Sequence, residues 1–554
     1  MLERFLPRVE FDSYEDFKEN YKVVAPENFN FGYDVVDYWA DTEKDKKALV
    51  WCDDHDHEYT FTFSDIKKLS NKTCNFLKRS GLKKGDVCLL IMRQRYEYWI
   101  IATALIKMGV IVIPATLQLT KKDVAYRANA AGVKMIIAID DPYVIEQIEL
   151  AKPEMPTVKY TGLVNGHKDG WFDFHKEIEN ESEVFDRPVG LEATKGSDIM
   201  QIYFTSGTTG MPKMVCHNYY HPLGHIVTAK YWHQVQENKL HLTNSDSGWA
   251  KFGWGKIYGQ WICGATIFTY DMDKFQATKM LEMIQKYKIT TFCVPPTIYR
   301  FMLQEDVAAY DLSSVEHFST AGEPLNPDVV LRWEKFTGKK IYSGFGQTEG
   351  TVLIADFPWF EPIPGALGKP APIYNIKLVN QDGKECENGE EGEIVVDDVN
   401  ENPPVGLFVG YYKDEEQTAK ALGTGRYNLK DVAWRDNDGY YWFVGRHDDV
   451  IKCSGYRIGP FEVESALIEH PAVVECAITA APDPVRGQVV KATIVLAKGY
   501  EPSDALTKEL QEHVKKVTAP YKYPRIVEYV AELPKTLGGK IKRAQIRNED
   551  MNKA

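Results

Sequence analysis

The chain has 554 residues, of which 44% are hydrophobic and 26% are charged, and its formal net charge is −13. This length predicts two or more domains with enough apolar residues for sizeable cores. The acidic balance argues against nucleic acid as the main partner, because binding to a phosphate backbone needs a basic surface. It does not argue against a small anionic ligand, since a small site can be locally basic.

Cysteine use and the N-terminal residues bear on the compartment. None of the nine cysteines forms a C-x-x-C pair, which favours reduced intracellular thiols over a disulfide frame or a zinc site. The N-terminal residues mix acids and bases and have neither the apolar run of a secretory signal nor the acid-poor composition of a transit peptide. The most apolar stretch, residues 100–114, is too short to span a bilayer. We therefore expect a cytoplasmic protein without a membrane span.

The first elements predicted along the chain are an acidic helical lead-in and a hairpin. The lead-in covers residues 1–45, and residues 48–51 and 59–63 are typical of two paired strands. Between these strands, residues 53–58 have the sequence DDHDHE, which could suggest a metal site. Charged residues at a hairpin tip usually form a solvated turn, so we assign this segment no function.

Helices and strands alternate over residues 64–140. Continuous apolar strands separated by helices are typical of parallel sheets covered on both faces. The same alternation resumes over residues 266–342. The fold class is therefore α/β, with a large N-terminal part in which helices cover parallel-rich sheets. In the first stretch we predict helices at 64–80, 96–108 and 121–131 and strands at 87–92, 110–115 and 134–139.

The pattern changes twice in the second half of the chain. From about residue 360, short strands separated by glycine turns predict a small antiparallel, β-barrel-like unit. After residue 446, two helices and two strands predict a β/α unit of about 100 residues, which is enough for a small domain.

A loop rich in glycines and hydroxyl groups follows the strand predicted at residues 199–204. It reads YFTSGTTGMPK and covers residues 203–213. Glycines let backbone N–H groups converge on an anion, hydroxyls add donors, and Lys213 adds a positive charge suited to a polyphosphate. It is not a Walker A loop, because Pro212 precedes the lysine and the segment is extended or turning there. A glycine-rich surface turn is the alternative for this composition alone. The candidate phosphate-binding residues are Thr205, Ser206, Gly207, Thr208, Thr209, Gly210 and Lys213.

Two further glycine-containing loops follow predicted strands. One reads TAGEP at residues 320–324, and the other reads YSGFGQTEG at residues 342–350. Ligands collect outside the carboxyl ends of parallel strands, so both loops are expected to face the first loop. Glu349 offers a hard carboxylate for Mg²⁺, and Thr348 offers a hydroxyl for a phosphate oxygen. Taken singly, each loop is equally consistent with a glycine-rich connection.

Three more motifs complete a set of six. They read NLKDVA at residues 428–433, GRHDDVIKCSGYRIGP at 445–460 and LPKTLGGKIKR at 533–543. In this order, the six motifs resemble those of the adenylate-forming superfamily, which joins acyl-CoA synthetases, luciferases and peptide-synthetase adenylation domains. The resemblance covers residues from roughly 200 to 545. It implies an enzyme that uses ATP and Mg²⁺ to convert a carboxylic acid into an acyl adenylate.

The resemblance also implies roles for single residues. Asp431 would accept hydrogen bonds from the ribose hydroxyls, with Arg446 near the ribose and Arg457 near phosphate. Lys540 would be the catalytic lysine that bridges the acyl carboxylate and the α-phosphate. Catalysis would also depend on Glu349 as the Mg²⁺ ligand and on Thr348. The other residues implied to bind ATP are Gly322, Glu323, Pro324, Ser343, Gly344, Phe345, Gly346 and Gln347.

Three C-terminal stretches narrow the resemblance to medium-chain acyl-CoA synthetases. They read SGYRIGP at residues 454–460, APDPVRG at 481–487 and APYKYPR at 519–525. In that family the C-terminal domain rotates between two half-reactions about a hinge, which would be Asp448 here. The expected domains are an adenylation domain at residues 1–447 and a mobile α/β lid domain at residues 448–554. The residues implied to bind CoA are Ser454, Gly455, Tyr456, Arg486, Tyr521, Lys522 and Tyr523.

The acyl pocket is expected within GWAKFGWGKIYGQWICG, residues 248–264, where the family lines that pocket. Trp254 is bulky enough to shorten a tunnel, and Gly346 would let backbone approach the acyl chain. These features favour a short-to-medium or branched acid. Lys251 is an unexpected cation there, with solvent exposure as the alternative. Core packing explains the aromatic residues equally well.

Other functions stay open from the sequence. An adenylating enzyme that loads a carrier protein would be active with the carrier and inactive with free CoA. A silent nucleotide-binding regulator is disfavoured by the joint presence of the catalytic lysine, the acidic residues and the arginine named above. A luciferase-like oxygenase is disfavoured only by the CoA-type motifs. The expected partners are a small carboxylic acid, ATP and CoA, with no nucleic acid and with a homodimer allowed for.

Overall fold

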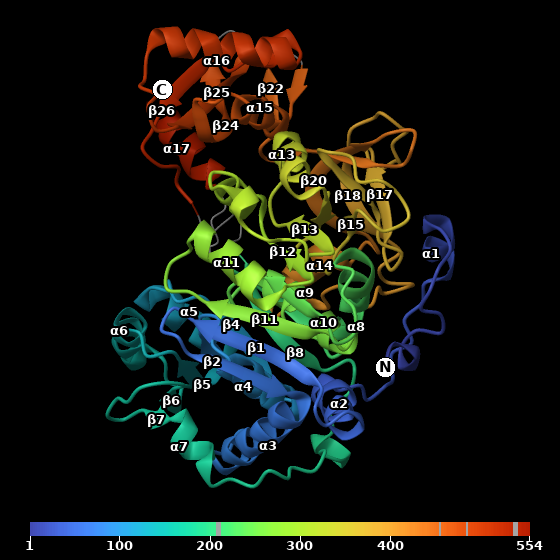
Figure 1. Cartoon of the computed structure of the whole chain (residues 1–554), viewed down its shortest axis with the longest axis vertical. Helices are drawn as coiled ribbons and strands as arrows, with labels where there is room; N and C mark the ends of the chain where they lie inside the picture. The colour runs from blue at the N-terminus through green and yellow to red at the C-terminus, as the bar shows by residue number, and fades with distance from the viewer. Residues whose placement is uncertain (206–211, 454–455, 484–485, 536–540, 554) are drawn as a thin grey trace.

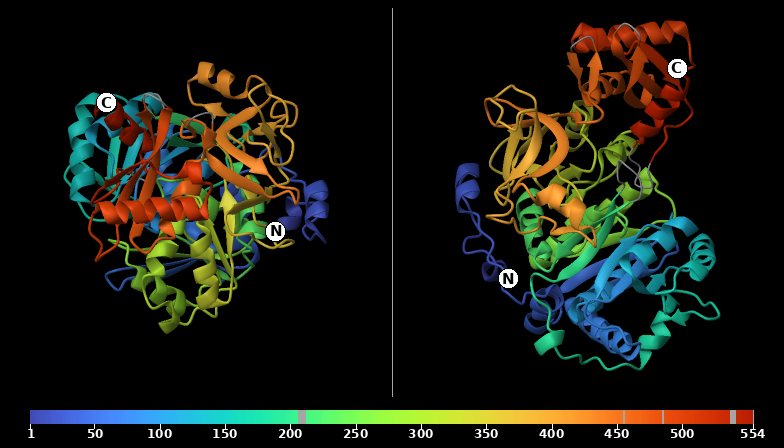
Figure 2. Two further views of the ribbon diagram at one scale, coloured as in Figure 1. Left: turned by 90° about the horizontal axis from the view of Figure 1, so that it is seen from above. Right: turned by 180° about the vertical axis from the view of Figure 1, so that it is seen from behind.

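A computed structural model describes residues 1–205, 212–453, 456–483, 486–535 and 541–553. Within these ranges the strands form three sheets. Two large sheets and their helices make up the body of the molecule, and the third sheet belongs to a C-terminal unit at one end (Figures 1 and 2). The α/β fold class predicted from the sequence is confirmed.

The first large sheet has a parallel centre with one antiparallel edge. Its order is β19-β9-β8-β4-β3-β5-β6-β7, and β8 and β9 pair antiparallel on either side of the candidate phosphate loop. β3 and β4 are buried at every residue, because helices or sheet cover both of their faces. The strands are β3 (Val87–Ile91), β4 (Ile111–Ala115), β5 (Val133–Ala138), β6 (Tyr160–Leu163), β7 (Phe172–Asp173), β8 (Ile199–Thr205), β9 (Lys213–Asn218) and β19 (Gly410–Tyr411).

The second large sheet combines a parallel half with an antiparallel half. Its order is β17-β18-β20-β21-β16-β15-β14-β13-β12-β10-β11-β1-β2. The predicted barrel-like strands are thus joined by hydrogen bonds to the parallel strands through β15 and β16. The strands are β1 (Lys47–Asp53), β2 (Glu58–Thr62), β10 (Leu240–Thr243), β11 (Thr266–Asp271), β12 (Thr291–Cys293), β13 (His317–Ala321), β14 (Ile341–Phe345), β15 (Ile354–Ala355), β16 (Ala366–Pro370), β17 (Asn375–Val379), β18 (Gly392–Asp397), β20 (Tyr427–Arg435) and β21 (Tyr441–Arg446).

The helices of the body begin and end at identifiable signals. The helix predicted from Ser64 begins at Phe63 instead, because Thr62 and Asp65 form a reciprocal capping box at its first turn. α4 is buried on all sides, so apart from Glu97 and Lys107 near its ends its sequence is mostly apolar rather than amphipathic. The helices are α1 (Tyr14–Asn20), α2 (Tyr38–Thr42), α3 (Phe63–Arg79), α4 (Glu97–Met108), α5 (Lys121–Ala131), α6 (Pro142–Ala151), α7 (Phe174–Glu179), α8 (His221–Ile226), α9 (Ala250–Gly255), α10 (Tyr258–Ile262), α11 (Ala277–Tyr287), α12 (Pro296–Met302), α13 (Pro327–Thr337) and α14 (Glu415–Leu422), with shorter 3-10 or π segments η1 (Leu2–Arg4), η2 (Gly32–Asp37), η3 (Lys152–Glu154), η4 (Gly190–Glu192), η5 (Val227–Trp232) and η6 (Val307–Ala309).

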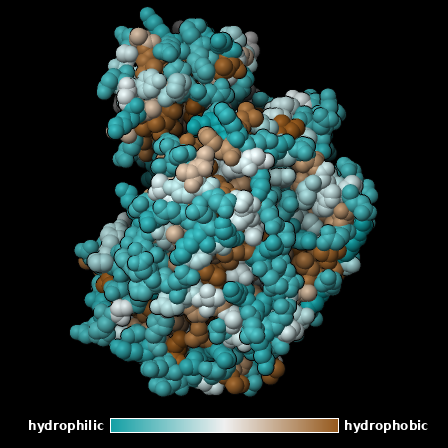
Figure 3. Space-filling model, in the orientation of Figure 1, coloured by the Kyte–Doolittle hydropathy of each residue, from teal (hydrophilic) through white to brown (hydrophobic). Residues whose placement is uncertain are grey.

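The C-terminal unit has a sheet and a core of its own. Its strands follow the order β23-β22-β25-β24, with β26 parallel to β25, and its buried apolar cluster is drawn from residues 451–514. It meets the body where the Phe461 ring lies 6.2 Å from that of Phe443 and where Asn326 Nδ2 donates to the Ser465 carbonyl at 3.3 Å. The surface narrows between the two parts and is mostly hydrophilic in this view (Figure 3). The elements are β22 (Ile451–Cys453), β23 (Tyr456–Ile458), α15 (Pro460–Ile468), β24 (Val473–Asp483), β25 (Gly487–Leu496), α16 (Asp504–Val517), η7 (Pro520–Lys522), β26 (Ile526–Tyr529) and α17 (Arg543–Lys553).

Candidate functional site

The two strands around the candidate phosphate loop are described, whereas most of the loop is not. β8 ends at Thr205, which pairs with Lys213 at the start of β9. Lys213 Nζ lies 4.8 Å from the ring centroid of Tyr411 in β19. The strand pairing therefore places Thr205 and Lys213 opposite each other at the two ends of the loop. The predicted residues Ser206, Gly207, Thr208, Thr209 and Gly210 lie outside the described residues.

The second and third motifs lie at the same edge of the second sheet. β13 and β14 are parallel neighbours, with Thr320 opposite Ser343 and Ala321 opposite Gly344. The loops that leave their carboxyl ends therefore start side by side. The predicted residues Gly322, Glu323 and Pro324 follow β13, and Glu323 accepts a hydrogen bond from Thr297 Oγ1 at 2.7 Å.

A buried carboxyl group that the sequence did not reveal supports the end of β14. The Ser343 amide donates to Asp356 Oδ2 at 2.7 Å, and the Asp356 amide donates to the Ser343 carbonyl at 2.9 Å. Burial raises the pKa of Asp356 to about 8. An isolated acid in a sequence gives no sign of such a contact, because β15 meets β14 only in the folded chain.

Gln347 joins two other predicted residues, Asp431 and Arg446. Gln347 Nε2 donates to Asp431 Oδ2 at 2.5 Å and to the Leu429 carbonyl at 2.7 Å, and the Tyr427 hydroxyl donates to Gln347 Oε1 at 2.9 Å. Asp431 and Arg446 are cross-strand partners in β20 and β21, and Arg446 Nε lies 3.6 Å from Asp431 Oδ1. The register of two antiparallel strands and one loop therefore brings together a buried carboxylate, a guanidinium group and an amide.

Glu349 shares one neighbour with Lys213. Burial raises the pKa of Tyr411, and the adjacent Glu349 carboxylate raises it further through its charge and a hydrogen bond. Lys213 lies over the ring of the same tyrosine. The Glu349 carbonyl accepts from the Phe408 amide at 2.7 Å. Tyr411 thus links the third motif to the first. It could not be predicted from the sequence, because it lies far beyond the end of the third motif at Gly350.

The donor set fits Mg²⁺ in the way that nucleotide sites usually hold it. Mg²⁺ is commonly bound by one or two carboxylates together with waters and substrate phosphates rather than by a cage of protein ligands. Glu349 offers one such carboxylate beside Lys213 and the strands of the phosphate loop. In the described part of the chain, no group of three or more histidine, cysteine or acidic side chains could hold a metal ion.

Two tryptophans lie against the glycines of the third motif. A Cβ atom on Gly346 would come within 2.4 Å of the Trp254 ring, and one on Gly344 within 2.3 Å of the Trp232 ring. The two indoles contact each other edge to face, with ring centroids 6.2 Å apart. Glycine is therefore required at both positions by the close approach of the indoles. Trp232 was not predicted, because it lies before the stretch that the resemblance indicated.

Lys251 shares α9 with Trp254 and is half-buried, with its ammonium group turned to the protein. Its Nζ donates to the Ala321 carbonyl at the end of β13 at 2.9 Å. Burial lowers the pKa of Lys251. The predicted alternative of a solvent-exposed lysine therefore does not hold, and the cation lies at the carboxyl end of the same parallel strands as the motif loops.

The candidate CoA residues are carried by the C-terminal unit. Lys522 pairs with Glu462 at 2.5 Å, and the Tyr523 ring lies 4.3 Å from Lys515 Nζ and 4.7 Å from the Arg525 guanidinium. Arg486 and Tyr521 are exposed. Asp448 lies in an exposed turn between β21 and β22. Tyr456 and Arg457 belong to β23, where only their backbone is described, and Ser454, Gly455 and Lys540 lie outside the described residues.

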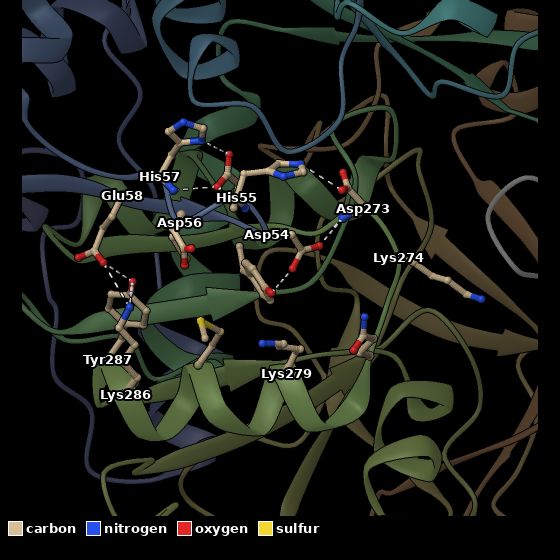
Figure 4. Close-up of a pocket in the computed structure, with 15 residues that line it drawn as sticks. Asp54, His55, Asp56, His57, Glu58, Asp273, Lys274, Lys279, Lys286 and Tyr287 are labelled. Atoms are coloured by element: carbon tan, nitrogen blue, oxygen red, sulfur yellow. Dashed lines mark hydrogen bonds and ion pairs between the residues drawn. The ribbon is translucent and has the colours of Figure 1, made fainter.

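The charged hairpin tip forms a polar hollow apart from the motif loops. The hollow of about 470 Å³ is lined by residues 52–58 and by residues of β11, of α11 and of the segment between them (Figure 4). His57 pairs with Asp53 at 2.9 Å and His55 with Asp273 at 3.2 Å. These charged side chains pair with one another at the tip of the hairpin.

Comparison with known proteins places the chain in a family. A model of the AMP-binding enzyme family matches residues 36–412, and a model of the AMP-binding enzyme C-terminal domain matches residues 462–540. The chain therefore belongs to the AMP-binding enzyme family. It is 41% identical to the rat acyl-coenzyme A synthetase ACSM3 over 98% of this chain and 94% of that protein, and 42% identical to human ACSM4 over 95% and 91%. The prediction that it is an AMP-forming acyl-CoA synthetase related to the medium-chain group is confirmed.

Solved structures support the same assignment. The anthranilate CoA ligase AuaEII, in complex with anthranoyl-AMP, matches 95% of this chain and 98% of its own, with a TM-score of 0.86 and 28% identity. The Brucella canis acyl-CoA synthetase matches 98% and 100%, with a TM-score of 0.74 and 28% identity.

The predicted cytoplasmic location is contradicted by the relatives. ACSM3, ACSM4 and ACSM5 are all named as mitochondrial proteins. Composition failed here because location depends on signals that receptors recognise and not on the fold. Within the described ranges, no helix is long and apolar enough to cross a membrane.

Proposed function

We propose that this enzyme activates a short-to-medium or branched carboxylic acid with ATP and transfers the acyl group to CoA, releasing AMP and pyrophosphate. One observation carries the proposal. Four consecutive residues, Gly346 to Glu349, touch three different environments: the Trp254 wall, the Gln347 contact to Asp431, and the contact of Glu349 with Tyr411 beside Lys213. Acyl, ribose and phosphate groups of one acyl adenylate would each meet one of these environments.

The nucleotide would be held by charge and by hydrogen bonds. The buried Asp431 carboxylate can accept from both ribose hydroxyls, and Gln347 and Arg446 orient it. Lys213, Thr205 and the loop between them would contact the phosphates. Mg²⁺ held by Glu349 would neutralise charge on the departing pyrophosphate. The acid's carboxylate attacks the α-phosphorus, the bond to pyrophosphate breaks, and Lys540 would stabilise the growing charge.

The second step would use the C-terminal unit. The CoA sulfur attacks the acyl carbonyl, AMP leaves with its phosphate oxygen, and a thioester forms. We place the boundary between residues 447 and 448, with Asp448 as the hinge. The exposed turn at Asp448 and the separate core of the C-terminal unit support this division. Light scattering on the purified protein would decide between a monomer and the homodimer that the sequence allows for.

In this proposal, the Trp254 side chain limits the length of the acyl chain that the pocket accepts. Replacing it with alanine is expected to raise kcat/KM for decanoate relative to butyrate by about tenfold or more, because each methylene buried in place of the indole gains roughly 0.8 kcal/mol. The measurement is acid-dependent pyrophosphate release with both acids. Trp442→Ala is a suitable control, because the Trp442 ring stacks on that of Trp434 in β20, with ring centroids 5.4 Å apart, and its Nε1 donates to Asp436 Oδ2 at 2.9 Å. An unchanged ratio in Trp254→Ala would remove Trp254 from the acyl pocket.

A panel assay tests the proposal and its rivals together. Pyrophosphate release is measured for acids from acetate to decanoate, with branched and aromatic members, in the presence of free CoA or of an acyl carrier protein. The proposal expects turnover with CoA and a preference for the shorter or branched acids. Turnover with the carrier alone would favour a carrier-loading enzyme, and ATP binding without any pyrophosphate release would favour a regulator.

A further inference from the structure

Three buried histidines form a column beside the third motif. His217 is in β9, and His221 and His225 follow in α8, one helical turn apart. All three are nearly inaccessible, with exposed fractions of 0%, 2% and 0%. The ring centroids of His217 and His221 are 3.8 Å apart, and those of His221 and His225 are 4.6 Å apart. No step of the proposed reaction uses these side chains.

Their hydrogen bonds fix one neutral tautomer for each ring. His221 Nδ1 is 3.2 Å from the Gly406 carbonyl, so this nitrogen carries the proton and donates. His221 Nε2 must then accept from His225 Nε2 at 3.1 Å, which leaves His225 Nδ1 to accept from the Thr228 hydroxyl at 3.2 Å. The rings of His221 and His225 can therefore both be satisfied without any charge.

His217 is the member that reaches the motif. Its Nε2 lies 2.8 Å from the Thr348 carbonyl, so Nε2–H donates to that oxygen. Its Nδ1 is buried and has no partner in the described ranges. The ring is thus committed to a single bond, and that bond ends on the peptide unit between Thr348 and Glu349.

The histidine column also binds the segment at residues 406–408, which contacts the Glu349 carbonyl. His221 binds the Gly406 carbonyl, and two residues later the Phe408 amide donates to the Glu349 carbonyl at 2.7 Å. Glu349 is therefore fixed through its own carbonyl and through that of Thr348. A carboxylate that must meet a metal ion and phosphate gains from such rigid support, because small displacements cost large factors in rate.

We propose that His217 is a positioning residue for the adenylation half-reaction: its Nε2–H holds the Thr348 carbonyl and so sets the direction of the Glu349 carboxylate and the Thr348 hydroxyl. This role rests on the proposed function of Glu349. It concerns only the step in which phosphate bonds change, since thioester formation from a finished acyl adenylate needs neither group.

The test measures adenylation and thioester formation separately in three variants of His217. His217→Gln can place an amide N–H near the position of Nε2, whereas His217→Asn is one methylene shorter and His217→Leu has no donor. Adenylation is measured as acid-dependent pyrophosphate release at several Mg·ATP concentrations. Thioester formation is measured from pre-formed acyl adenylate and CoA.

The expected result is a selective loss. His217→Leu and His217→Asn should lower the adenylation rate about tenfold or more and raise KM for Mg·ATP, while His217→Gln stays within about threefold of the natural protein. Thioester formation should change less than twofold in all three. His241→Gln serves as a control, because His241 is equally buried but bonds Thr291 and Thr243 in the parallel sheet.

Two outcomes would overturn the role of His217. One is an equal loss in both half-reactions, which would mean that the ring is only structural. The other is adenylation within twofold of the natural protein in a folded Asn or Leu variant. If His217→Leu fails to fold, the difference in adenylation rate between His217→Gln and His217→Asn still tests the role of the Nε2–H donor. Failure of the natural protein to release pyrophosphate would count against the proposed function itself, before any variant is compared.

Discussion

Replacing Glu349 with glutamine is expected to lower the rate of adenylation by about 100-fold or more while leaving the fold intact. The amide keeps the size of the carboxylate and can still accept from Tyr411, so the local packing is preserved. It loses the negative charge that would hold Mg²⁺ beside the phosphates, and the loss of one well-placed electrostatic contact typically costs factors of this size. The measurement is acid-dependent pyrophosphate release over a range of Mg²⁺ concentrations.

The control for this variant is the same substitution at Glu361, a surface glutamate that forms an ion pair with Lys340. Glu361 is exposed and pairs with Lys340 at 2.6 Å, so Glu361→Gln should leave adenylation unchanged. Glu349→Gln should also still convert pre-formed acyl adenylate and CoA to acyl-CoA. Adenylation within twofold of the natural protein, at any Mg²⁺ concentration, would exclude Glu349 as the metal ligand.

Acid is expected to destabilise this protein well above the pH at which carboxylates protonate. His233, His241 and His317 form a second buried cluster, and the rings of His233 and His241 lie 4.8 Å apart. Burial lowers the pKa of His241 to about 3 and that of His317 to about 4, and it lowers the pKa of His233 as well. These side chains are therefore neutral in the folded protein at pH 5.

The sign of the effect follows from proton binding. Histidines of the unfolded chain take up protons near pH 6.5, whereas the folded ones stay neutral to pH 4 or below. The unfolded chain then binds more protons, so the free energy of unfolding is fully retained above about pH 6.5 and falls as the pH drops towards 4. Each such histidine contributes roughly 2 kcal/mol of loss between pH 6.5 and pH 5.

Thermal unfolding between pH 8 and pH 5 measures this effect. The Tm should fall by several degrees below pH 6.5, and His317→Gln should reduce that fall even if it lowers the Tm at pH 8. His55→Gln provides the control, because His55 is 62% exposed at the hairpin tip and should not alter the slope. A Tm that is flat from pH 8 to pH 5 would contradict the assignment of neutral buried histidines.

The main strands and the position of the motif loops were predictable from the sequence. The apolar runs at residues 87–92 and 110–115 became β3 and β4 because a strand buried on both faces must be apolar throughout. The motif loops lie at the carboxyl ends of β13 and β14 because parallel strands align those ends. Local pattern and chain direction were sufficient for these elements.

The contacts that support the site were not predictable in the same way. Tyr411 and His217 each touch a motif residue that is remote in sequence, and Asp356 touches one on a neighbouring strand. Their residue types carry no signal for such contacts. Lys251 shows the same limit, since a lysine in an apolar stretch does not reveal whether its ammonium meets water or a backbone carbonyl. Tertiary packing decides these cases.

Identification of the products with and without CoA tests the proposed reaction most directly. The protein is incubated with ATP, Mg²⁺ and the acid that is turned over fastest in the panel assay. The products are separated and identified by mass spectrometry. The proposed reaction predicts acyl adenylate and pyrophosphate without CoA, and acyl-CoA, AMP and pyrophosphate when CoA is added. Formation of ADP and phosphate would contradict it. Formation of acyl-CoA in the reaction with CoA, while the reaction lacking CoA yields no acyl adenylate, would contradict it as well.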